Sequence, residues 1–279
     1  MATKKAATAK ATKKTVTAKA KKPSVDTAPL ADYERTLNLQ RWLSGIYGVQ
    51  AVALLLLGNA YEITVSRTFL VLDTLSSSSE QLVYSPAVRQ LFDVNILHMI
   101  AGTMFILAVL QLLAVTVFRD KYLHSLEVRT FVLRSITFGV GVTATVWTVA
   151  LLSGIRDVSV LGLLAVCVSA AMVSFYLYQQ RSARKATTLL GWFAGIAAAV
   201  VLAAAPIGAF MYDGAFPAYL YGIYGALVVY LAAITVLVIR SEKRGGSQRA
   251  RLRAERSLGI ALLGLQSLVV WQVFLGVLS

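Results

Sequence analysis

The sequence predicts an all-α integral membrane protein, a bundle of seven transmembrane helices with its N-terminus in the cytoplasm. Hydrophobic residues make up 57% of the 279 residues, only 14% are charged, and the mean hydropathy is +0.69. A water-soluble domain could not hide that much apolar surface. Seven long apolar blocks recur along the chain, and the segments between them alternate in net charge. A single cysteine excludes a disulfide framework.

The first 35 residues predict a disordered, basic cytoplasmic tail. They contain eight lysines and no apolar run, unlike a secretory signal or an arginine-rich transit peptide. One interpretation is a solvated tail that fixes the orientation of the chain. The other is adhesion to anionic lipid or nucleic acid, because each lysine near an anionic bilayer adds about 1 kcal/mol. The membrane domain then occupies residues 36–279.

Each apolar block has the length and composition of a membrane-crossing helix. The first block, LNLQRWLSGIYGVQAVALLLLG, covers residues 37–58. The other six run approximately from Ile96 to Phe118, Phe131 to Gly154, Val158 to Tyr178, Thr188 to Met211, Pro217 to Ile239 and Leu258 to Leu278. Glycine pairs at helical spacing in three of the blocks (Gly45 and Gly48, Gly191 and Gly195, Gly222 and Gly225) predict close helix packing.

One connection is long, the segment 59–93. It contains TVSRTFLVLD and EQLVYS, which are rich in β-branched and aromatic residues and are separated by Ser76 to Ser79. This pattern predicts a small β-hairpin after the first helix, with a flexible loop as the alternative.

Charge indicates which side of the membrane each connection occupies. The segments 1–41, 119–134, 181–185 and 240–256 carry net charges of +7, +2, +3 and +5. The intervening segments carry −2, 0 and −1. By the positive-inside rule the N-terminus is cytoplasmic, the loop 59–93 is extracellular and Ser279 is outside a cell membrane that the chain crosses several times.

The last block resembles the final helix of the heliorhodopsins, seven-helix retinal proteins with a cytoplasmic N-terminus. Eight residues of the stretch from Glu255 to Ser279, which contains this block, match the family pattern: Glu255, Arg256, Trp271, Gln272, Val273, Phe274, Gly276 and Leu278. The family's lysine, which holds retinal as a Schiff base, falls on Gln266. The resemblance also implies a rhodopsin-like bundle, an extracellular sheet after the first helix and a homodimer that uses this sheet.

The third and fourth blocks carry the second half of the resemblance. The matching residues are Arg134, Ala150, Leu152, Ser153, Gly154, Ile155, Asp157, Ala170, Met172 and Phe175. The family's glutamate counterion falls on Thr137, three residues after the arginine. If the family register is kept, Gln266 points at Thr137 across the bundle.

The departures from the family gather where its photochemistry takes place. Family histidines of the first and second helices fall on Tyr47 and Gln111, an asparagine of the fourth on Ser169, and a Pro-Trp pair on Ala198 and Ala199. The candidate pocket is therefore lined by neutral groups: Tyr47, Gln50, Gln111, Thr137, Ser169, Met172 and Gln266.

Covalent retinal is not expected, because an imine needs a lysine inside the bundle and every lysine lies in a predicted cytoplasmic segment. No arrangement typical of catalysis or of metal binding occurs, so an enzyme is not expected either. The sequence favours a heliorhodopsin-like protein that has lost covalent retinal and acts as a ligand-binding or signalling scaffold, with membrane lipid and a small apolar ligand as candidate partners. The alternatives are a transporter or channel, and a photoreceptor-like protein with a non-covalently bound chromophore.

Overall fold

The computed structural model describes residues 30–58, 61–73, 83–128, 132–179, 185–211, 217–243 and 248–278. Over these residues the chain forms eight α-helices and one two-stranded sheet. The elements are α1 (Leu30–Leu57), β1 (Glu62–Leu72), β2 (Tyr84–Asn95), α2 (Ile96–Val115), α3 (Arg119–Val128), α4 (Val132–Leu152), α5 (Val158–Gln179), α6 (Lys185–Met211), α7 (Ala218–Lys243) and α8 (Gln248–Leu278).

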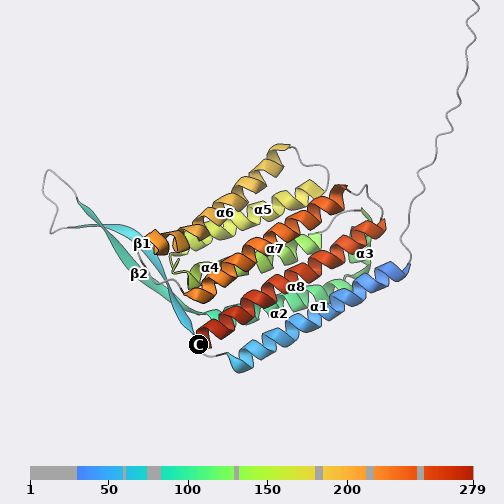
Figure 1. The fold of residues 1–279 in the computed structure, drawn as a ribbon, viewed down its shortest axis with the longest axis horizontal. Helices are drawn as coiled ribbons and strands as arrows, with labels where there is room; N and C mark the ends of the chain where they lie inside the picture. Colours follow the sequence, from blue (N-terminus) through green and yellow to red (C-terminus); the bar gives the residue numbers. More distant parts are fainter. Residues whose placement is uncertain are drawn as a thin grey trace, which may run out of the picture.

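The long helices pack side by side as one bundle, and the hairpin projects from one of its ends (Figure 1). Helix α4 contacts α2 and α5, α6 packs on α5, and α8 contacts α1, α4 and α7. Helices α1 and α8 run in the same direction, because Asp32 lies near Arg249 at their first turns and Gln50 bonds to Ser267 further along. We call the end where α1 and α8 begin the basic end, and the opposite end the hairpin end.

Four helical segments are long and apolar enough to cross a bilayer within the described residues. They are Ile96–Val115, Ser135–Leu152, Leu189–Met211 and Gln248–Gly276, and Val158–Ser174 and Ala218–Val229 are shorter apolar helices. Helix α1 is absent from this set, since Gln40, Arg41 and Gln50 lower its hydropathy. A helical membrane bundle is thus confirmed, and the crossing of all seven long helices stays a prediction.

The helices differ from the predicted blocks mainly at the basic end. Helix α1 begins at Leu30, so residues 30–35, which were assigned to the tail, are helical. Helix α8 begins ten residues before Leu258 and includes four arginines and Glu255. The short helix α3 was not predicted, because its polar sequence RDKYLHSLEV has no apolar block. Charged residues here continue the helices beyond their apolar parts, which hydropathy alone cannot detect.

The predicted hairpin is confirmed, but its second strand lies later in the chain than expected. Strand β2 is antiparallel to β1 and runs past Pro86, which pairs with Leu70. The expected strand EQLVYS shares only Tyr84 and Ser85 with it, and residues 80–82 lie outside the described residues. The expected strand stops at Ser85, immediately before Pro86, but a strand in a two-stranded sheet has a free edge where the missing N–H of a proline costs nothing.

The base of the hairpin is fixed to the bundle. Ile63 and Val65 are buried in the main hydrophobic core. At the β-bulge after Val65, the Ser66 N–H donates to the Arg156 carbonyl at 2.9 Å, and the Thr68 N–H donates to the Asp157 carboxylate at 2.7 Å. The outer part of the hairpin extends away from these contacts (Figure 1).

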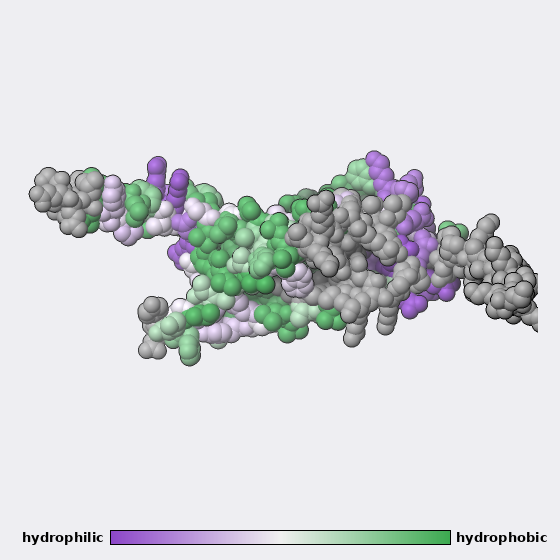
Figure 2. All heavy atoms as spheres, turned by 90° about the horizontal axis from the view of Figure 1, so that it is seen from above, coloured by the Kyte–Doolittle hydropathy of each residue, from purple (hydrophilic) through white to green (hydrophobic). Residues whose placement is uncertain are grey.

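The surface separates by polarity along the bundle. Figure 2 shows apolar surface over the middle and hydrophilic residues at the basic end and on part of the hairpin. At the basic end Asp32 lies 3.8 Å from Arg249 and 3.9 Å from Arg256, and Glu34 pairs with Arg119 at 2.7 Å. These ion pairs join α1 to α8 and α3. An apolar girdle between polar ends is the surface that a bilayer requires.

Candidate functional site

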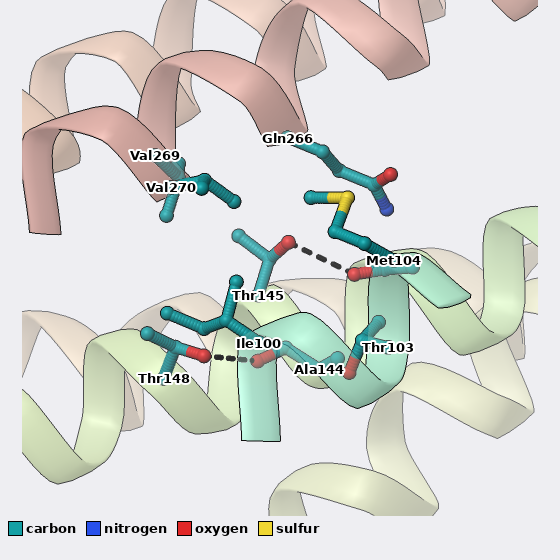
Figure 3. Close-up of a pocket in the computed structure, with 10 residues that line it drawn as sticks. Ile100, Thr103, Met104, Ala144, Thr145, Thr148, Gln266, Val269 and Val270 are labelled. Carbon is teal, nitrogen blue, oxygen red and sulfur yellow. Dashed lines mark hydrogen bonds between the residues drawn. The ribbon is translucent and has the colours of Figure 1, made fainter. Parts of the chain in front are cut away.

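Gln266 lies near the middle of the apolar part of α8 and is 2% exposed. Its carboxamide extends from α8 into the space between α2 and α4 (Figure 3). Neither its nitrogen nor its oxygen has a hydrogen-bond partner among the described residues. A buried amide without hydrogen-bond partners costs about 1–3 kcal/mol of stability.

Gly141 of α4 provides the room for this amide. A Cβ at residue 141 would lie 1.9 Å from Gln266 Nε2, far inside contact distance. Any larger residue would therefore force the amide to move. Thr137, toward which Gln266 is expected to point, lies four residues before Gly141 on α4.

A cavity of about 20 Å³ lies beside the amide. The lining residues come from α2, α4 and α8: Ile100, Thr103, Met104, Gly141, Ala144, Thr145, Thr148, Gln266, Val269 and Val270. Three of them are threonines, and each hydroxyl donates to the carbonyl four residues earlier at 2.8–2.9 Å. Because these protons are used, the threonine oxygens can only accept hydrogen bonds from an occupant of the cavity.

A second cavity, also of about 20 Å³, lies toward the basic end. Its polar lining consists of Gln40, Gln111, Tyr122, Thr137 and Glu255, and its other residues are Leu133, Phe138, Gly259 and Leu262. Each polar member is buried. The two cavities together contain three of the seven predicted pocket residues: Gln266 in the first, Gln111 and Thr137 in the second.

The other four predicted residues do not line either cavity. Tyr47 is fully buried in the main core, and its hydroxyl has no partner among the described residues. Gln50 is bonded to Ser267 at 2.8 Å, Met172 packs against the core, and Ser169 is exposed on α5. The seven predicted residues are therefore distributed over two cavities, the core, the contact between α1 and α8, and the outer face of α5.

Glu255 is the charged residue among the cavity-lining residues that the sequence reasoning missed, a set that also includes Gln40, Tyr122 and Thr145. Glu255 is 4% exposed and lines the second cavity, although its position in a charged segment placed it in the cytoplasm. It is buried because α8 begins at Gln248, two turns earlier, and carries Glu255 alongside α1 and α4. The available signal was its match to the heliorhodopsin pattern.

The matched segment Ser153–Asp157 forms the junction between α4, α5 and the hairpin. Gly154 has a φ of 87°, a conformation that favours glycine. Ser153 is hydrogen-bonded to the Tyr224 hydroxyl at 3.0 Å, and that hydroxyl donates to the Leu202 carbonyl at 2.9 Å. Two backbone N–H groups, first that of Thr68 and then that of Ser159, hold the pKa of Asp157 down at about 2.

The described residues form a helical bundle with apolar surface over its middle, buried polar residues on several helices and a hairpin docked on an inter-helix loop, which is the architecture of a helical membrane protein. The heliorhodopsin family model matches residues 36–278, which is most of the chain. This protein belongs to the heliorhodopsin family. A comparison with curated proteins gives no match.

Proposed function

We propose that this protein is a heliorhodopsin-family member that does not hold retinal covalently and acts as a binding or signalling scaffold in the membrane. The observation that carries the proposal is the Gln266 carboxamide, which stands where the resemblance places the retinal lysine. An amide nitrogen is not a nucleophilic amine and cannot form the imine. The lysines of the described helices are Lys121 in α3 and residues 185 and 243, which begin α6 and end α7.

The size of the interior supports the same proposal. Pockets for organic ligands have volumes of about 300 Å³ or more, whereas the cavity beside Gln266 has about 20 Å³. Both the chemistry of Gln266 and the size of this cavity support the absence of retinal from the protein. A small apolar ligand would have to displace core side chains, so contacts at the surface are favoured over an enclosed ligand.

An absorption spectrum tests the proposal directly. Purified protein incubated with all-trans retinal is expected to show no band to the red of free retinal, with Gln266→Lys as the matched variant that restores an amine. A red-shifted band that borohydride bleaches irreversibly in light would overturn the proposal. A band that organic solvent extracts intact would instead support a non-covalently bound chromophore.

The hairpin is the surface that we propose for homodimer formation. Leu70 and Val88 are 70% and 66% exposed on a sheet that projects from the bundle, and exposed apolar surface of this kind marks contact sites. The mass of the particle in nanodiscs tests this: the parent should be a dimer, and Leu70→Asp with Val88→Asp should be a monomer. A monomeric parent would contradict it. The lysine-rich part of the basic tail lies in residues 1–29, outside the described residues, and is proposed to bind anionic lipid or nucleic acid.

A transporter or channel is the competing function. Ion and proton pathways generally use charged groups near the membrane centre, and the polar residues that line the cavity at Gln266 are neutral. One observation supports this alternative: an acidic residue, Glu255, lines the second cavity, toward the basic end. Ion flux in liposomes equal to that of empty liposomes is the expected result, and flux lost in Glu255→Gln would favour transport.

A further inference from the structure

We propose that the cavity beside Gln266 is a binding site for one water molecule, which joins α8 to α4. This inference goes beyond the proposed function and does not depend on it, because it concerns the protein without any chromophore. It rests on three observations: an amide that is 98% buried and has no hydrogen-bond partner among the described residues, a cavity at its side, and threonine oxygens that line this cavity.

The hydrogen-bonding inventory selects water among the candidate occupants. Gln266 provides two N–H donors and a carbonyl acceptor, and Thr145 provides an oxygen whose own proton is already donated to the Gly141 carbonyl at 2.9 Å. An occupant must therefore both accept from Gln266 and donate to Gln266 or Thr145, which water does. A metal cation finds no carboxylate here, and an apolar group would leave the amide without a partner.

The size and walls of the cavity agree with this assignment. A water molecule needs about 10–15 Å³ of such space, so a cavity of about 20 Å³ holds one molecule and not a chain of them. Ile100, Val269 and Val270 form apolar walls around the polar patch.

Nuclear magnetic resonance provides the direct test. The full-length protein is labelled with ¹⁵N-glutamine in nanodiscs, and the Gln266 side-chain signal is identified by its loss in Gln266→Met. We expect a through-space cross-peak between this NH₂ group and water, which the Thr145→Val variant weakens. Cross-peaks from the NH₂ group to carbon-bound protons alone, in the otherwise unchanged protein, would overturn the inference.

Thermal unfolding provides an independent test with opposite expectations for a wet and a dry site. If water bridges the two helices, Gln266→Met and Thr145→Val should each lower the midpoint by about 3–6 °C. The double variant should be hardly less stable than Gln266→Met, because both act through the same molecule. If the amide is dry, Gln266→Met removes an unpaired polar group and the midpoint rises or stays unchanged, which would overturn the inference.

Thr116→Val is the matched control for the threonine. The Thr116 hydroxyl also donates to the carbonyl four residues earlier, at 2.7 Å, but the residue is exposed and lines neither cavity. The thermal unfolding midpoint of Thr116→Val should stay within about 1 °C of that of the parent protein. A loss in Thr116→Val as large as that in Thr145→Val would show that the helix bond is responsible and would overturn the assignment to water.

Discussion

At the scale of single residues, the interior depends on the pairing of a glutamine with a glycine. Gln266 fits into the bundle because Gly141 has no side chain, and the amide occupies the position that a Cβ would take. The two residues lie on different helices, 125 positions apart in the sequence. A substitution of either residue should therefore change the packing around the other residue.

Gly141→Ala is expected to destabilise the protein by about 1–3 kcal/mol, since the new methyl group pushes the Gln266 amide out of its place. The midpoint of thermal unfolding in detergent measures the loss. Gly139→Ala is the matched control on the same helix, because its Cβ would lie 3.9 Å from the nearest atom, in Met172. Equal midpoints for the two variants would show that the amide moves aside without cost.

Asp157 gives a second prediction at this scale. Its carboxylate accepts from the Thr68 and Ser159 N–H groups, which lowers its pKa from the ordinary 3.8 to about 2. A depressed pKa means that ionised Asp157 stabilises the folded state at every pH above about 4, and that this contribution is lost as the pH falls from about 4 to about 2.

Protection of the Thr68 amide against hydrogen exchange should therefore fall over that pH range, after correction for the intrinsic exchange rate. Asp157→Ala should remove the protection at neutral pH. Asp93→Ala is the control: Asp93 accepts from the Thr64 hydroxyl at 2.5 Å within the hairpin and is not bonded to the α4–α5 loop by any described contact. Unchanged protection in Asp157→Ala would mean that the sheet alone holds the Thr68 amide.

At the scale of elements, glycines decide how closely the helices approach. The sequence predicted close packing at three glycine pairs, and the structure confirms it for Gly191 and Gly222. Gly45, Gly48, Gly195 and Gly225 have nothing within 4 Å of a Cβ position. Glycine spacing alone cannot distinguish the two groups. The same spacing can occur on a helix face that contacts a neighbouring helix and on a face that is exposed to lipid.

The pair in α6 gives a matched test of this point. Gly191→Ala should destabilise the contact between α5 and α6, because its Cβ would lie 2.4 Å from the Ser174 Cβ, whereas Gly195→Ala should be neutral or slightly stabilising. The expected difference is about 1–3 kcal/mol. It can be measured by reversible unfolding in mixed detergent, and equal stability would imply that α6 shifts freely on α5.

At the scale of the whole molecule, the positive-inside rule predicts the orientation. Native Cys167 is replaced by serine, and a single cysteine is introduced either at Val88 in the hairpin or at Arg253 at the basic end, both of which are exposed. In intact cells a membrane-impermeant thiol reagent should label Val88→Cys, and it should label Arg253→Cys only after lysis. The reverse pattern would place the N-terminus outside.

The sequence predicted the bundle and the hairpin because apolar blocks and β-branched runs are local signals. It did not predict that Gln266 faces Gly141, that Ser169 faces outward, or that Glu255 is buried. Those facts depend on the rotation of each helix about its axis and on where α8 begins, which neighbouring helices decide. The family register located the right turns of the helices but not the contacts between them.

The parallel contact between α1 and α8 has a consequence for biosynthesis. Asp32 and Gln50 find their partners Arg249 and Ser267 only when α8 exists, about 190 residues after α1 is complete. At a translation rate of about 5–20 residues per second, synthesis of α8 begins about 10–40 s after synthesis of α1 is complete. During this interval the polar face of α1 needs lipid headgroups, water or an insertion chaperone. Ribosome stalling before α8 should therefore leave a chain that the cell's membrane quality control recognises as incomplete.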